Sequence, residues 1–214
     1  MLAHPIPGPE FHVLHALMLK RTASEGLLAA ATRLEPDALR ATVALLAERG
    51  LVHAQPDGEL VATPEGRDAH AAALRAEMRD EARQRGVLAT YRRFLRLNPR
   101  VLELASRWQV RTEDGREVPN DHADPDYDRR CVAGLEQVHR RAVPALQPAR
   151  CAVPRFGLYE VRLSEALHRL RAGDIRYFTG LHVESYHTLW FELHEDLLMS
   201  LGLRREQEGR ACVG

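Results

Sequence analysis

The sequence lacks several features that mark whole classes of protein. No apolar run approaches the roughly 20 residues that a membrane-spanning helix needs, so we expect no membrane partner. The N-terminus has no basic start followed by a long apolar stretch, which argues against a secretory signal. The cysteines Cys131, Cys151 and Cys212 are odd in number and far apart. This pattern favours a reducing, cytoplasmic location over a disulfide framework or a zinc ribbon.

The motifs of nucleophilic and nucleotide-dependent enzymes are also missing. The sequence contains no Gly-x-Ser-x-Gly, no phosphate-binding P-loop and no Gly-x-Gly-x-x-Gly. We therefore expect neither enzymatic activity nor a cofactor. Lysine is almost absent, because Lys20 is the only one, so nearly all of the positive charge is arginine.

The chain has no excess of either charge, with a formal net charge of zero. Residues 1–76 hold seven basic and nine acidic residues, which leaves this segment near −2. Proteins that bind nucleic acid normally carry a basic face. The slightly negative charge of residues 1–76 therefore mildly favours a protein-interaction module over a DNA-binding one, although it leaves the predicted fold unaffected.

What is present favours a mainly α protein. The chain has 214 residues, of which 45% are hydrophobic, enough for one large domain or two small ones. Apolar residues from Phe11 to Met18 recur at helical spacing. Thr22 or Ser24 can cap a second helix, and Glu35-Pro36-Asp37 begins a third that Gly50 ends.

Two short extended runs follow, at 51–54 and 59–63, around the turn sequence Gln-Pro-Asp-Gly. Thr63 and Pro64 then begin a helix that we expect to extend to about Arg85. Further helices are predicted at 87–108, 128–146, 156–171 and 175–201. Pro99 should break or kink the first of them, a polar loop should span 111–127, and a turn should span 144–154.

The order of these elements, with "LLAERGLV" before the hairpin and "TPEGRDAH" after it, resembles the winged helix-turn-helix domain of MarR-like transcriptional regulators. The resemblance covers about a third of the chain. It implies a winged-helix DNA-binding domain at 10–76 with a small β-hairpin wing. A linker helix at 77–86 and a helical effector and dimerisation domain at 87–214 would follow.

The resemblance also implies a function and a set of contacts. The partners would be double-stranded DNA, a second copy of the chain and a small-molecule effector. The third helix would enter the major groove, with Arg40 as the guanine contact and the wing near the minor groove. The predicted DNA-contacting residues are Arg33, Pro36, Asp37, Arg40, Ala41, Ala44, Arg49 and His53.

Aromatic residues make up only 6% of the chain, yet they gather in its second part. A core explains most of them, but a partly aromatic pocket is also what a small-molecule sensor requires. Arginines could receive an anionic ligand there by bidentate contact. The residues predicted to bind such a ligand are Arg155, Arg162, Arg176, Tyr186 and Trp190.

Histidine and carboxylate residues cluster in "HVESYHTLWFELHEDLL" and in "NDHADPDYD". Together they suggest a metal site, in a metal-dependent sensor or enzyme, with His122, His182, His187 and His194 as candidate ligands. The spacing matches neither His-Glu-x-x-His nor a calcium-binding loop of the EF-hand type. The alternative is an amphipathic helix with solvated polar residues and an ordinary turn, which we favour.

Overall fold

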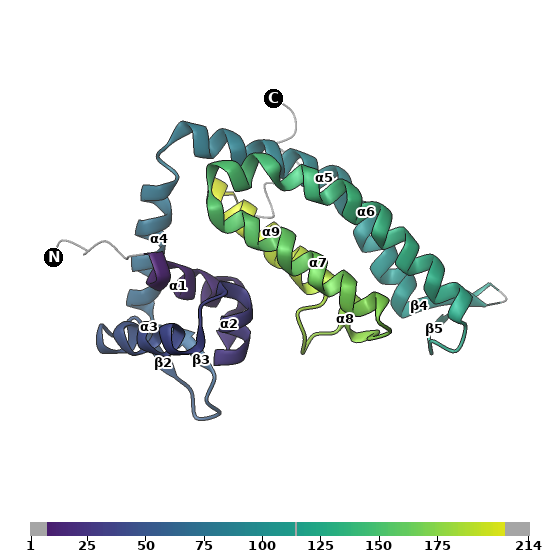
Figure 1. Cartoon of the computed structure of the whole chain (residues 1–214), viewed down its shortest axis with the longest axis horizontal. Coiled ribbons are helices and arrows are strands. Elements are labelled where there is room, and N and C mark those ends of the chain that lie inside the picture. Colours follow the sequence, from purple (N-terminus) through teal and green to yellow (C-terminus); the bar gives the residue numbers. More distant parts are fainter. Residues whose placement is uncertain (1–7, 114, 204–214) are drawn as a thin grey trace. The chain divides into compact units, whose positions relative to one another are not determined.

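The computed structural model of the protein describes residues 8–113 and 115–203, so Cys212 lies outside the described residues. The protein is mainly helical (73% helix) with a small antiparallel sheet. It divides into two compact units, residues 1–81 (unit 1) and 82–214 (unit 2) (Figure 1). Within the described ranges, no helix has the length and apolar character needed to cross a bilayer.

Unit 1 places short helices around a small three-stranded sheet. Its elements are α1 (Gly8–Lys20), β1 (Thr22–Ala23), α2 (Glu25–Thr32), α3 (Pro36–Glu48), β2 (Val52–Ala54), β3 (Leu60–Ala62) and α4 (Pro64–Glu77). The strand order is β1-β3-β2, and both pairings are antiparallel. The core is largely aliphatic and centres on α1, with Val13, Leu14 and Leu17 fully buried.

Local sequence signals account for most helix ends in unit 1. The Ser24 side chain accepts a hydrogen bond from the amide of Leu27 and caps α2, which ends at Arg33 in the left-handed conformation. Pro36 occupies the first turn of α3, where its missing N–H costs nothing. Gly50 follows α3 with φ +67°, a conformation that glycine adopts without strain.

The strands join the helices at one corner of unit 1. Thr63 accepts a hydrogen bond from the amide of Gly66 at the start of α4 and donates one to the carbonyl of Gly50 at 2.7 Å. A Cβ atom on Gly66 would lie 2.0 Å from the carbonyl oxygen of Leu51. Glycine therefore allows α4 to pack directly against the turn that leads into β2.

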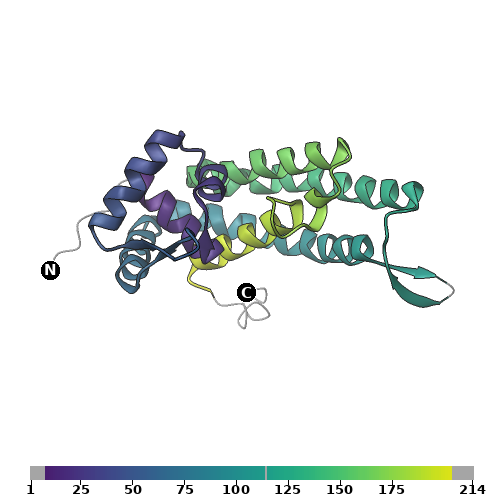
Figure 2. The same ribbon diagram turned by 90° about the horizontal axis from the view of Figure 1, so that it is seen from below.

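Unit 2 is a helical bundle. Its elements are α5 (Glu81–Gln109), β4 (Val110–Glu113), β5 (Arg116–Pro119), α6 (Pro125–Ala152), η1 (Pro154–Phe156), α7 (Gly157–Arg171), α8 (Arg176–Thr179) and α9 (Tyr186–Leu201). The long helices α5 and α6 lie side by side, and the ribbon of β4 and β5 extends beyond their ends (Figure 2). Helix α7 packs against both α6 and α9.

Aromatic side chains fill the centre of unit 2. Phe94 of α5 stacks on Trp190 of α9 with ring centroids 4.6 Å apart, and its ring also lies 4.8 Å from that of His194. The indole N–H of Trp190 donates to Asn98 on α5 at 3.0 Å. Near one end of the unit, Trp108 stacks on Phe178 at 4.5 Å. The aromatic residues of the second part therefore join α5 to the C-terminal helices.

Two predictions about helix continuity are wrong. The predicted helix from Thr63 to about Arg85 is divided, because α4 ends at Glu77 and α5 begins at Glu81 and runs through Gly86. Gly86 lies inside α5, and a Cβ atom there would lie 2.6 Å from the carbonyl oxygen of Pro148 on α6. Glycine at this position therefore allows α5 and α6 to approach closely. The predicted helix at 175–201 is also divided, since Ser185 caps a new helix, α9.

Two predicted irregular segments are instead regular. The predicted polar loop at 111–127 contains the β4–β5 hairpin, with Glu113 opposite Arg116. The predicted turn at 144–154 is helical as far as Ala152, so α6 contains both Pro144 and Pro148. Contacts with α5 stabilise that part of α6: Thr90 accepts a hydrogen bond from the amide of Ala149 at 3.0 Å.

Candidate functional site

Helix α3 has one buried and one exposed face. The buried face carries Leu39, Thr42 and Leu46, with Val43 half-buried. Five of the predicted DNA-contacting residues are exposed along the helix: Pro36, Asp37, Arg40, Ala41 and Ala44. Ala38, Ala41 and Ala44 on this side are small, so an approaching surface could come close to the helix backbone.

The cations beside this face have partners within unit 1. The guanidinium of Arg40 lies 2.5 Å from a carboxylate oxygen of Asp37 one turn earlier, and both side chains are more than half exposed. Exposed pairs of this kind stabilise by only about 0–1 kcal/mol, so Arg40 can leave Asp37 at little cost. Arg49 instead forms an ion pair with Glu10 of α1. That pair connects the C-terminal end of α3 to α1.

The hairpin of unit 1 carries exposed polar residues. His53 lies on β2 opposite Val61 and is exposed. In the turn, Asp57 accepts a hydrogen bond from the amide of Glu59, and the Glu59 carboxylate accepts one from Thr22 on β1 at 3.1 Å. The tip of the hairpin is therefore acidic.

The two units carry opposite net charge. Residues 1–81 hold eight basic and twelve acidic residues, whereas 82–214 hold 22 and 18. Unit 1 is therefore near −4 and unit 2 near +4 with neutral histidine. Arg33, one of the predicted DNA-contacting residues, follows α2 as its C-cap in this acidic unit.

Four of the five residues predicted to bind a ligand belong to the core of unit 2. Arg155 and Arg162 are buried, as are the aromatic rings of Tyr186 and Trp190. The fifth, Arg176, is exposed and pairs with Asp174 at 2.7 Å. None of these five residues lines either of the two cavities of unit 2, at His122 and at Arg93.

The two buried arginines are neutralised by carboxylates from α9 and the segment before it. Arg155 contacts Asp196 at 3.1 Å and Ser200 at 2.6 Å, and Tyr159 donates to the same carboxylate at 3.2 Å. Buried cations require such partners because an isolated charge is strongly disfavoured away from water. Burial, followed by the charge of Asp196, raises the pKa of Tyr159 well above its usual range.

Arg162 forms the second buried cluster. It binds both carboxylate oxygens of Glu184, and it contacts Glu192 of α9 at 2.7 Å. Burial alone would lower the pKa of Arg162, but Glu192 and Glu184 outweigh it, so the pKa is raised and the charge is retained. Sequence interpretation missed this role because the partners are 22 and 30 residues away.

The predicted metal-binding histidines do not converge. His122 precedes α6, His182 is exposed between α8 and α9, and His194 is buried against Phe94. His187 packs edge-on against Phe191, and burial lowers its pKa. Within residues 8–113 and 115–203, no group of three or more metal-ligating side chains is suitably arranged.

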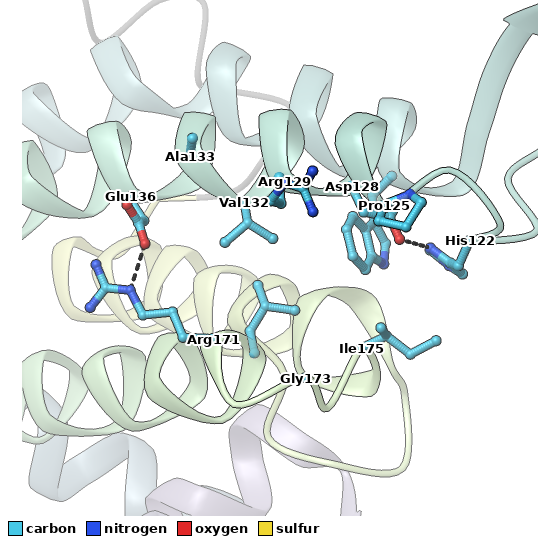
Figure 3. Close-up of a pocket in the computed structure, with 12 residues that line it drawn as sticks. His122, Pro125, Asp128, Arg129, Val132, Ala133, Glu136, Arg171, Gly173 and Ile175 are labelled. Carbon is cyan, nitrogen blue, oxygen red and sulfur yellow. Dashed lines mark hydrogen bonds and ion pairs between the residues drawn. The ribbon is translucent and has the colours of Figure 1, made fainter.

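A cavity of about 550 Å³ lies in unit 2 between the first half of α6 and the end of α7 (Figure 3). Its wall is mostly apolar, including Trp108, Val132, Leu170 and Ile175. Glu136 and Arg171 form an ion pair at its edge (Figure 3). This size and lining are typical of sites for small molecules.

The polar end of the cavity is a hydrogen-bonded set around His122. The imidazole Nδ1 lies 2.9 Å from a carboxylate oxygen of Asp128, and buried Asn120 donates to the other oxygen at 3.0 Å. Because a carboxylate only accepts, His122 donates from Nδ1, and in the neutral imidazole Nε2 is then the acceptor. The His122 backbone has φ +60°, and its ring packs 4.6 Å from that of Trp108.

Sequence interpretation identified His122 and the density of polar residues around it but missed the rest of the cavity. A weak signal was present, because Asp124 and Pro125 form a recognisable helix start that aims Asp128 back toward the preceding loop. Trp108, Leu170 and Ile175 come from separate helices and loops, so no local pattern joins them.

Comparisons with models of known protein families, with curated proteins and with solved structures found no match.

Proposed function

We propose that this protein is a sequence-specific, double-stranded-DNA-binding transcriptional regulator. In this proposal unit 1 is a winged helix-turn-helix domain and unit 2 is an effector and dimerisation domain. The observation that carries the proposal is the arrangement of α3, which follows α2 after a short connection, buries one face against α1 and exposes the other. The β2–β3 hairpin, with β1 completing the sheet, is typical of a wing.

In this function α3 lies in the major groove and Arg40 releases Asp37 to contact a guanine. The small side chains of Ala41 and Ala44 let the helix approach the bases closely. Because unit 1 is acidic, few phosphates are neutralised, and we expect binding that depends less steeply on salt than that of a strongly basic domain. Two copies of α3 in a homodimer would read a two-fold sequence.

The cavity beside His122 is the proposed effector site. A fitting ligand has an apolar body that packs against Trp108 and Val132, and one polar group that contacts Nε2 of His122. Binding would alter the spacing of the two α3 helices in the dimer. Coupling free energies between such sites are typically about 1–3 kcal/mol.

The test is selection from random DNA duplexes by the purified full-length chain at low salt, with Arg40→Ala alongside. We expect enrichment of a two-fold motif that the variant loses. Arg75→Ala is the matched control, because Arg75 is an exposed arginine on α4 and lies outside the proposed interface. Absence of enrichment for the unmodified chain at any salt concentration would contradict the proposal.

One observation favours a second candidate, a winged-helix module that binds protein instead of DNA. The exposed side of α3 is largely alanine, and Leu45 on it is 50% exposed. Acidic residues flank this surface at Asp37 and Glu48. In this alternative Leu45→Glu abolishes partner binding, whereas Arg40→Ala has little effect, so the two substitutions distinguish the candidates.

A further inference from the structure

A second cavity, of about 430 Å³, lies between α5 and α6 and is lined by arginine. Arg93, Arg96 and Leu97 contribute from α5, and Arg141, Pro144 and Ala145 contribute from α6. All three arginines are exposed at the cavity. Arg92 and Arg140 directly precede two of them in the sequence and add to the positive charge.

Among the described residues, the arginines that line this cavity have no acidic partner, unlike Arg100 and Arg150 on the same two helices. Arg100 pairs with Glu103 at 2.6 Å, and Arg150 pairs with Glu160 at 2.5 Å. Among the described residues, none of the arginines that line the cavity forms an ion pair, and none of the lining residues is acidic. The like charges repel one another, so binding an anion there would relieve that repulsion.

Two prolines in α6 help to fix this arrangement. Pro148 has no N–H, so the carbonyl of Pro144 one turn earlier lacks its usual helix donor. A guanidinium N–H of Arg93 donates to that carbonyl at 3.3 Å. This contact turns Arg93 toward α6 and Arg141, and it leaves most of the five guanidinium N–H donors for a ligand.

We propose that the Arg93–Arg96–Arg141 cavity binds a small anion that carries two or more phosphoryl groups. Arginine suits phosphoryl oxygens because its planar donors bind them in pairs. Three cations match a ligand with several negative charges better than a single carboxylate. The cavity lies wholly in unit 2 and shares no lining residue with the His122 cavity. The proposal therefore stands independently of the proposed effector site.

The experiment is calorimetric titration of the full-length chain with tripolyphosphate, pyrophosphate and orthophosphate at constant ionic strength. We expect saturable binding that strengthens from orthophosphate to tripolyphosphate. The double variant Arg96→Ala/Arg141→Ala should bind tripolyphosphate at least about tenfold more weakly. The control Arg116→Ala/Arg169→Ala removes the same charge from exposed positions of unit 2 outside the cavity and should bind as the unmodified chain does.

Several results would overturn the proposal. These are no saturable binding of tripolyphosphate, equal weakening in both double variants, or binding that does not strengthen from orthophosphate to tripolyphosphate. A fourth is a cavity variant that loses duplex DNA binding while tripolyphosphate binding is unchanged, because the arginines would then contact the DNA backbone. Arg40→Ala changes only α3 in unit 1. Its effect on DNA binding therefore tests the proposed function without altering the cavity.

Discussion

The two units use charged residues differently. In unit 1 the ion pair on α3, between Arg40 and Asp37, is exposed, and the core around α1 is largely aliphatic. Unit 2 buries whole guanidinium groups, with the side chain of Arg162 only 3% exposed between Glu184 and Glu192. Such clusters tolerate few arrangements, because each buried charge requires its partner. The packing of α7 against α9 therefore depends on charge pairing as well as on apolar contact.

The largest expected effect comes from breaking a buried cluster. Arg162→Ala removes the buried cation that both Glu184 and Glu192 contact, and we expect a loss of about 3–5 kcal/mol in unfolding free energy. Both tryptophans, Trp108 and Trp190, belong to unit 2, so tryptophan fluorescence during urea unfolding reports on this unit.

The exposed pair in unit 1 supplies the comparison for this experiment. Arg40→Ala removes a cation of the same type, but its pair with Asp37 is exposed, so the loss of unfolding free energy in unit 1, followed by far-ultraviolet circular dichroism, should stay below about 1 kcal/mol. If Arg162→Ala were as mild as Arg40→Ala, the distinction between the two units would be wrong.

A smaller effect is expected at the corner of unit 1. Thr63→Ala removes the hydroxyl that caps α4 and bonds to Gly50, which should cost about 1–2 kcal/mol. Thr63→Ser keeps the hydroxyl and should restore most of the stability. Unit 1 contains no tryptophan or tyrosine, so fluorescence does not report on its unfolding. The loss is measured instead by far-ultraviolet circular dichroism, which follows the helices. Equal losses in both variants would show that the cap does not stabilise unit 1.

The smallest effect concerns pH. Ser164 donates its only hydroxyl hydrogen to the carbonyl of Glu160, so His139 donates to Ser164 from Nε2 and accepts from Tyr186 at Nδ1. This network holds a neutral imidazole. Burial, and then the positive charge of Arg171, lowers the His139 pKa below 6.5, although Glu160 acts in the opposite direction.

Because the folded pKa of His139 is depressed, its stabilising contribution is complete above pH 6.5 and is lost as the pH falls through the folded value. The unfolding free energy of unit 2, followed by tryptophan fluorescence, should therefore decrease from pH 6.5 downward. His139→Gln should reduce that decrease. An identical pH profile for both proteins would assign the decrease to other groups.

Local signals predicted unit 1 better than unit 2. The cap at Ser24, Pro36 in the first turn of α3 and the glycine after that helix are all short-range features, and the structure has each of them. In unit 2 the prolines of α6 suggested a turn, but the segment is helical. The contacts that compensate for the prolines come from Thr90 and Arg93, more than fifty residues away. Sequence spacing does not identify such partners.

The hairpin at β4–β5 was missed for a different reason. Its strands are mostly polar and half-buried or exposed, so they lack an alternating apolar face. Asp114-Gly115 is a strong two-residue turn sequence that could have indicated it. The candidate sites show the same limit: His122 stood out by composition, but the walls of its cavity are assembled from α5, α6, α7 and the segment after α7.

The hydrogen bond between Ala149 and Thr90 has a consequence for measuring motion in unit 2. Pro144 and Pro148 have no amide proton, while the Ala149 amide is held by a side chain on a different helix. Exchange of that proton with deuterated solvent requires α5 and α6 to separate locally. Ala149 is therefore a natural single-site reporter of how often these two long helices come apart, before and after a ligand binds.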